Sequence, residues 1–130
     1  MTPEQKLKHA ILVCYANLYD HVRLPDCINA ENIDAVYEEI YNADDGTIYD
    51  AINEIRSSGE ETGLQCEWSR HYESKAVAAK MLDGSWVGWT YWYGGGKYGE
   101  PGAVDWMDEA YDLACKEEEK LVVVRTFTKA

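Results

Sequence analysis

The apolar residues of this 130-residue chain change their spacing near Gly59, and this change limits what the chain can fold into. Before Gly59 they recur every three or four residues, which is the period of a helix with one buried face. From Leu64 they alternate with polar residues, which is the period of a half-buried strand. The sequence therefore predicts an α+β fold in which N-terminal helices pack on a C-terminal antiparallel sheet of four or five strands.

Three helices are predicted in the first half of the chain. Thr2 and Pro3 suit the N-cap and first residue of one helix, and Asn29 suits the N-cap of the next. Asp44-Asp45-Gly46 interrupts the pattern, and Gly59 suits the C-terminal cap of the third helix. Their expected apolar stripes contain Leu7, Ile11, Cys14 or Tyr15, and Leu18; Ile33, Val36 or Tyr37, and Ile40; and Ile48, Ile52 and Ile55.

The second half predicts strands over residues 64–68, 74–81, 85–93, 111–116 and 121–128. Asp83-Gly84 is a strong signal for a tight hairpin between the second and third of these strands. A second hairpin is expected around Glu117-Glu118-Glu119, and its last strand is apolar and β-branched enough to be central. Residues 103–108 are expected to make a single helical turn.

Length and composition favour one domain over residues 1–130, with a helical half at about 1–60 and a sheet half at about 61–130. The N-terminus lacks the pattern of a secretory signal and no long apolar run exists, so we expect a cytoplasmic protein without membrane contact. Four cysteines without a Cys-x-x-Cys pair, and three histidines at unrelated spacings, predict no structural metal, disulfide or cofactor.

The net charge of −12 is concentrated in one quarter of the chain. Residues 31–61 contain ten acids against a single base, Arg56, and carry −9 of the total. Such a field repels nucleic acid and attracts basic surfaces, so direct nucleic-acid binding is not expected. The segment instead indicates a basic protein or protein complex as partner.

The acidic helices have two further interpretations besides a solvated surface. In one, carboxylate rows imitate a phosphate backbone and occupy the basic groove of a nucleic-acid-binding protein. In the other they bind a cation, but Asp44-Asp45-Gly46 is too short for a calcium loop of the EF-hand type. Spacing of four residues places two pairs on common helix faces. The candidate partner-binding residues are Asp34, Glu38, Glu39, Asp50 and Glu54.

An aromatic run directly before three glycines is the second candidate site. It is either ordinary core, covered by loops or a second chain, or a platform for a small ligand. The ligand-binding residues would be Trp86, Trp89, Tyr91, Trp92, Tyr93, Gly95 and Lys97. A phosphate-binding loop of the P-loop type is excluded, because Tyr91 and Tyr98 stand where it needs Gly and Ser or Thr. A backbone nest with Lys97 remains an open way to bind an anion.

Catalytic signatures are weak. In a strand, His71 and Glu73 would share a face and could act as a general base, although a surface ion pair explains them as well. Cys66 precedes His71 by five residues, but catalytic Cys–His pairs meet in space rather than along the chain. We therefore expect a protein that is not an enzyme.

Part of the second half resembles small uncharacterised proteins encoded by tailed phages and prophages. The resemblance covers residues 68–128 and rests on Ser69-Arg70-His71-Tyr72-Glu73, Trp92-Tyr93-Gly94-Gly95-Gly96-Lys97-Tyr98-Gly99-Glu100-Pro101, Asp105-Trp106-Met107 and Val123-Val124-Arg125-Thr126-Phe127. It implies a phage accessory gene acting in a bacterial cytoplasm and carries no activity. In that setting, inhibition of a host defence or nucleic-acid enzyme by the acidic helices is the leading hypothesis. A small ligand-binding module is the alternative.

Overall fold

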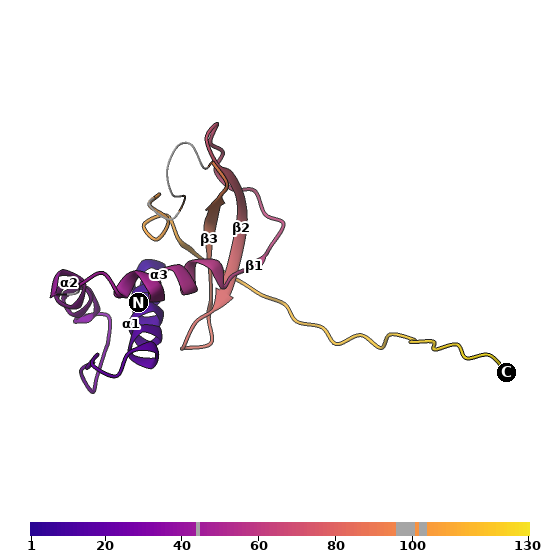
Figure 1. Ribbon diagram of the computed structural model, residues 1–130, viewed down its shortest axis with the longest axis horizontal. Helices are drawn as coiled ribbons and strands as arrows, with labels where there is room; N and C mark the ends of the chain where they lie inside the picture. The colour runs from indigo at the N-terminus through magenta and orange to yellow at the C-terminus, as the bar shows by residue number, and fades with distance from the viewer. Residues whose placement is uncertain (44, 96–100, 102–103) are drawn as a thin grey trace.

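The computed structural model describes residues 1–43, 45–95, 101 and 104–130. Its helices are α1 (Pro3–Leu18), α2 (Ile33–Ala43) and α3 (Ile48–Ser57). Its strands are β1 (Glu60–Glu61), β2 (Glu73–Lys80), β3 (Trp86–Tyr93) and β4 (Tyr111–Leu113). The strands form one antiparallel sheet in the order β1-β2-β3-β4, which confirms the α+β prediction (Figure 1).

Helix α1 begins as the sequence predicts. The Thr2 side chain accepts a hydrogen bond from the Gln5 backbone at 3.2 Å, and the Gln5 side chain accepts one from the Thr2 backbone at 2.9 Å. This capping box satisfies two backbone donors that the first turn leaves without helical partners. Of the two alternatives for the buried stripe, Tyr15 is buried and Cys14 only partly so. Leu18 is 46% exposed, so the buried stripe ends before the helix does.

The other helix boundaries include two corrections. Helix α2 begins at Ile33, so Asn29 lies before the helix rather than at its N-cap. Asn29 accepts backbone hydrogen bonds from Glu31 and Asn32 at 2.9 and 3.1 Å, in the turn that leads into α2. The prediction that Gly59 caps α3 is wrong, because Ser58 is the C-cap and Gly59 does not have a positive φ. Gly59 is needed for space instead: a Cβ atom there would lie 2.8 Å from the Val77 side chain.

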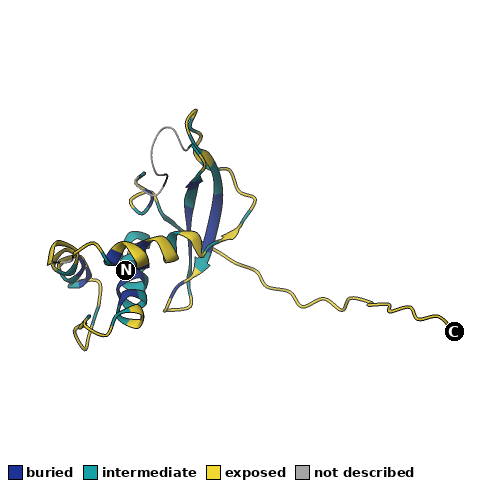
Figure 2. Cartoon of the chain, viewed as in Figure 1, coloured by how far each residue is buried: buried dark blue, intermediate teal, exposed yellow. Residues whose placement is uncertain are grey.

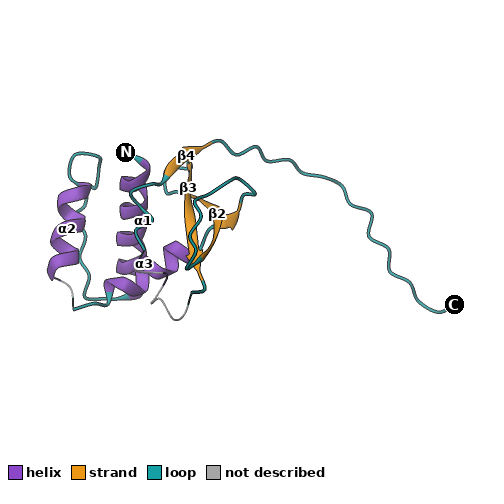
Figure 3. Ribbon diagram, turned by 90° about the horizontal axis from the view of Figure 1, so that it is seen from above, coloured by secondary structure: helices purple, strands orange, loops and turns teal. Residues whose placement is uncertain are grey.

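The helices cover one face of the sheet, and a single hydrophobic cluster joins the two layers (Figures 2 and 3). Helix α1 packs against both α2 and α3, and it also touches β3 and β4. The buried residues of this cluster are Leu7, Ile11, Leu12, Tyr15, Ile33, Tyr37, Ile48, Ala51, Ile52, Val77, Met81, Val87, Trp89 and Trp106.

The predicted hairpin between β2 and β3 is confirmed. All eight residues of each strand pair, from Glu73 with Tyr93 to Lys80 with Trp86. At the turn, the Asp83 carboxylate accepts a hydrogen bond from the Ser85 backbone at 2.9 Å, and Gly84 adopts a φ of +87°. The aspartate closes the turn and the glycine supplies a conformation that other residues rarely adopt.

The strand predicted over residues 64–68 is wrong. Gly63 has a φ of +76°, which turns the chain away from the sheet directly after the two-residue β1. The carbonyl of Glu67 then accepts a hydrogen bond from the Ser74 hydroxyl at 2.6 Å instead of joining a ladder. Trp68 is 80% exposed. Residues 64–68 do alternate apolar and polar side chains, but the Glu67 carbonyl hydrogen-bonds to a side chain rather than to a neighbouring strand.

The second predicted hairpin is also wrong. Only Tyr111–Leu113 forms a strand, and residues 114–130 continue from it as an extended, fully exposed segment. The helical turn predicted over residues 103–108 includes Ala103, which lies outside the described residues. From Val104 to Asp108 the chain makes bends and the start of a turn rather than a helix.

Candidate functional site

The acidic helical segment keeps its charges on the surface. All nine of the acids between residues 31 and 61 that the structure describes are exposed, while Asp44 lies outside the described part. Arg56, the only base of the segment, forms no ion pair with these acids among the contacts of the described residues. Its guanidinium packs on the Tyr91 ring at 4.8 Å from the centroid and donates to the Trp92 carbonyl at 2.9 Å. The segment's negative charge is therefore not neutralised by its own base.

Asp34 joins α2 to α1. Its carboxylate accepts hydrogen bonds from Lys8 Nζ at 3.0 Å and from the Gln5 amide at 3.1 Å. The hydrogen bond from Lys8, followed by the one from Gln5, holds the pKa of Asp34 below its usual value. Lys8 also lies 3.6 Å from Glu4. Asp34 is therefore already engaged in helix packing.

Asp50 and Glu54 lie one turn apart on α3. Asp50 contacts Tyr19, just after α1, and Glu54 lies near Cys14 of α1. The Tyr19 hydroxyl donates a hydrogen bond to Asp50, and this bond is the main reason that the pKa of Tyr19 is raised. Burial, followed by the neighbouring Glu54 charge, raises the pKa of the Cys14 thiol. A raised pKa keeps Cys14 protonated, which is the opposite of what a cysteine nucleophile needs.

Glu38 and Glu39 differ from the other three candidates. Both are exposed on α2, and neither forms an ion pair with any part of the chain that the structure describes. Asp34 contacts the first turns of α1, whereas Asp50 contacts Tyr19, just beyond the other end of that helix. The five candidates are thus not one row of carboxylates. Asp34 and Asp50 hydrogen-bond to α1 or to the residue just after it, and Glu54 lies near Cys14. Glu38 and Glu39 are the candidates without such contacts among the described residues.

The aromatic strand β3 divides between core and surface. Trp89 is fully buried, donates from its indole nitrogen to the Arg56 carbonyl at 3.1 Å, and packs on Trp106 with ring centroids 5.5 Å apart. Trp92 is 6% exposed on the opposite face of the sheet. The segment containing Cys66 crosses that face and contacts Ser74, which pairs with Trp92 in the ladder. The core interpretation therefore holds for both tryptophans, and Trp86 is partly buried.

Tyr91 and Tyr93 form the part of β3 that a ligand could reach. Their rings are stacked, with centroids 5.8 Å apart, and both are partly buried. Lys75 Nζ lies 5.7 Å from each ring centroid, and Arg56 covers Tyr91 from α3. Two tyrosines and two cations thus share the helix-facing side of the sheet. We call this group the tyrosine–cation cluster.

The glycine run beside the tyrosine–cation cluster is described only in part. Gly95 has a φ of +71°, and a Cβ atom there would lie 2.3 Å from the His71 carbonyl oxygen. Gly95 therefore lets two loops approach closely, which is a structural role. Lys97 lies outside the described residues. Arg70, His71 and Tyr72 form bends before β2, so the strand alternation expected for His71 and Glu73 does not apply.

One cavity was not anticipated from the sequence. It has a volume of about 540 Å³ and lies between the helices and residues 104–108. Tyr37, Tyr41, Tyr49, Lys8 and Trp106 are among its lining residues, and the hydroxyls of Tyr41 and Tyr49 hydrogen-bond to each other. Burial raises the pKa of Tyr37 to about 12. The sequence shows that Tyr37 and Tyr41 lie four residues apart on one helix. It contains no local signal that residues 104–108 lie beside them.

The four cysteines are free thiols, and the described residues contain no group of three or more His, Cys, Asp or Glu side chains that could hold a metal ion. None of the helices within the described ranges is long and apolar enough to cross a membrane. Comparison of the chain with protein-family models, curated proteins and solved structures found no match.

Proposed function

We propose that this protein is a non-catalytic interaction protein that binds a cationic surface of another protein through the exposed carboxylates of its helical half. The observation that carries the proposal is the uncompensated charge of residues 31–61. Their net charge is −9, and their only base is turned onto Tyr91 and the Trp92 carbonyl. A concentrated field of one sign raises the rate of encounter with an oppositely charged partner.

The contacts of the helices narrow the interacting residues to the α2 side. Asp34 and Asp50 hydrogen-bond to α1 or to the residue just after it, and Glu54 raises the pKa of the nearby Cys14 thiol, so changes at these three residues would mix internal contacts with any effect on an interface. Glu31, Glu38 and Glu39 are exposed and have no ion pair among the contacts the structure describes. Glu38 and Glu39 lie on α2 and Glu31 lies in the turn that leads into it; we call these three glutamates the α2 carboxylates of the proposed interface.

The class of partner follows from the chemistry. Clustered carboxylates repel nucleic acid and suit the basic groove of a protein that binds DNA or RNA. We further propose a bacterial host as the setting, which is what the phage-like sequence pattern of residues 68–128 would imply. We therefore propose inhibition of a host nucleic-acid enzyme or defence complex, by occupation of its nucleic-acid groove, as the specific form of the interaction.

The test compares two variants that change net charge equally. The first replaces Glu31, Glu38 and Glu39 by Gln, and the control replaces Glu117, Glu118 and Glu119 by Gln. Proteins captured from bacterial lysate are identified, and the dissociation constant for the captured partner is measured with each variant, together with the partner's affinity for a DNA duplex. The α2 variant is expected to bind at least about tenfold more weakly and to stop competing with DNA. Equal binding by both variants would contradict the proposal.

A second candidate, a small-ligand module, is favoured by the tyrosine–cation cluster. Stacked rings flanked by Arg56 and Lys75 would suit a planar anionic ligand. Tyr93→Ala, added to the same series, separates the two functions because Tyr93 lies away from α2. If Tyr93→Ala abolishes inhibition of the partner while the variant at Glu31, Glu38 and Glu39 still inhibits it fully, the ligand module is favoured.

A further inference from the structure

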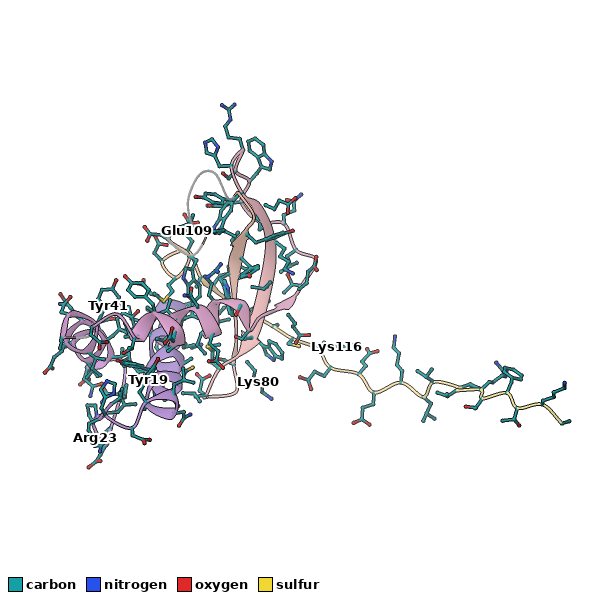
Figure 4. All side chains as sticks on the ribbon, viewed as in Figure 1. Tyr19, Arg23, Tyr41, Lys80, Glu109 and Lys116 are labelled. Carbon is teal, nitrogen blue, oxygen red and sulfur yellow. The ribbon has the colours of Figure 1, made fainter. Side chains whose placement is uncertain are left out.

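The C-terminal tail, residues 114–130, exposes the largest apolar segment of the molecule. Leu121, Val122, Val123, Val124 and Phe127 have exposed fractions between 75% and 105%. The tail leaves the sheet after β4 and extends away from the helices and the sheet, and its side chains beyond Lys116 point into solvent (Figures 1 and 4). Exposed apolar groups on this scale mark a surface that is covered by a partner.

The tail has the composition of a strand. From Leu121 to Thr128, β-branched, aromatic and aliphatic residues are interrupted only by Arg125. Such residues favour the half-buried surface of a sheet. Eight residues at about 3.3 Å each span about 26 Å, which is more than enough to pair along the three-residue β4, Tyr111–Leu113. The tail is therefore long enough to act as a full strand.

The tail is poorly suited to fold back on its own β4. The connection between Leu113 and Leu121 reads Ala-Cys-Lys-Glu-Glu-Glu-Lys and contains none of the residues that favour tight turns. Three adjacent glutamates would have to share the turn, where their charges repel. In the structure this connection is straight, with Lys116 Nζ 3.1 Å from the Glu118 carboxylate. A second chain is the natural source of a partner strand.

Charge favours another copy of this protein as that second chain. Residues 120–130 contain Lys120, Arg125 and Lys129 and no acid. The preceding 119 residues contain all 24 acids and only nine bases, a net charge of −15. The cationic segment 120–130 of one copy is therefore attracted to the anionic residues 1–119 of another.

A sheet edge is available to receive the tail. Strand β4 pairs with Trp86–Gly88 of β3 on one side and is the last strand of the described sheet. Its other side offers backbone donors and acceptors to an incoming strand. Because the tail follows β4 directly, two copies related by a two-fold axis can exchange tails across their β4 edges in a closed arrangement.

We propose that Leu121–Thr128 is a donor strand that pairs antiparallel with the β4 edge of a second copy, so that the protein forms a tail-exchanged dimer. Backbone hydrogen bonds supply the affinity, as in other cases of strand addition, and the alternating side chains are buried against the partner. The dimer leaves the α2 carboxylates of both copies free.

The test uses the full chain and two substitutions at Val123. Val123→Pro removes a backbone donor and cannot continue a ladder, whereas Val123→Thr keeps the donor and a β-branched side chain. Val123 is 75% exposed in the single chain, so neither change disturbs the core. Sedimentation equilibrium is expected to show a dimer for the natural chain and for Val123→Thr. Val123→Pro is expected to raise the dimer dissociation constant at least about tenfold.

Two further measurements locate the contact. Amide hydrogen exchange over residues 121–128 should slow as the protein concentration passes the dimer dissociation constant. A mixture of isotopically labelled and unlabelled copies should show contacts between the tail of one copy and Tyr111 or Leu113 of the other. A monomer with an exposed tail, a monomer whose tail is protected by its own β4, or a dimer that survives Val123→Pro unchanged would each overturn the proposal.

Discussion

Gly59 shows how one residue can be required for a reason different from the one its sequence context suggests. It follows α3, where a glycine commonly ends a helix in the left-handed conformation. In this fold the helix ends at Ser57 with Ser58 as its C-cap, and Gly59 instead lies against Val77 and Trp89. The absence of a side chain lets α3 pass directly into β1 above the core.

Two substitutions distinguish these roles. Gly59→Ala is expected to lower the free energy of unfolding by about 1–3 kcal/mol, because its Cβ would lie 2.8 Å from the Val77 side chain and 3.0 Å from Trp89. Gly59→Asn, which is larger, should be at least as damaging. Urea unfolding of both variants checks this. If Asn is tolerated better than Ala, the residue serves as a left-handed cap and the packing explanation fails.

At the scale of elements, α1 and α2 share the hydrophobic core and also an ion pair, Lys8–Asp34, whose pH dependence can be predicted. Because Lys8 and Gln5 lower the pKa of Asp34 in the folded protein, the unfolded chain binds the proton more tightly. The resulting stability is present above the ordinary aspartate pKa of 3.8 and is lost as the pH falls through the lower, folded value. The side chain of Asp34 is 60% exposed, so the effect is small.

A double-mutant cycle isolates this contact. Asp34→Asn and Lys8→Met, alone and together, should give a coupling energy of about 0.5 kcal/mol near neutral pH. The same cycle at a pH well below the ordinary aspartate pKa should give almost none, because the carboxyl is then neutral. Urea unfolding at both pH values supplies the data. A coupling energy that does not change with pH would mean that packing, rather than charge, joins the two helices.

Elements that carry their own start, stop or turn signals were predictable from the sequence. Thr2 and Pro3 mark the start of α1, and Asp83-Gly84 marks the β2–β3 turn. Residues 64–68 and 121–128 had the correct alternation but lacked a partner strand, and alternation alone does not say what a strand pairs with. Gly63, whose left-handed φ turns the chain after β1, was the local signal that could have corrected the first of these errors.

The candidate sites followed the same division. Trp89 and Trp92 were named as ligand-binding residues, but burial on the two faces of the sheet makes them core, which depends on segments distant in sequence. Charge concentration was visible from composition alone. Which carboxylates remain available was not, because the engagement of Asp34 depends on Lys8, 26 residues away.

The whole molecule separates its charges. The first 119 residues carry a net charge of −15 and are followed by the cationic, apolar segment 120–130, and −9 of the negative charge belongs to residues 31–61. Such an arrangement would keep two kinds of interaction apart, a partner at α2 and a second copy at β4. We propose that the α2 carboxylates control association with the cationic partner.

The most direct test is the association rate constant as a function of salt. It is measured with the captured partner from about 50 mM to about 500 mM salt, a range in which the screening length falls from above 10 Å to below 5 Å. The natural chain and the Glu117, Glu118, Glu119 control should associate at least about tenfold more slowly at high salt. The Glu31, Glu38, Glu39 variant should start slower and depend less on salt. Identical salt dependence in all three proteins would contradict the account.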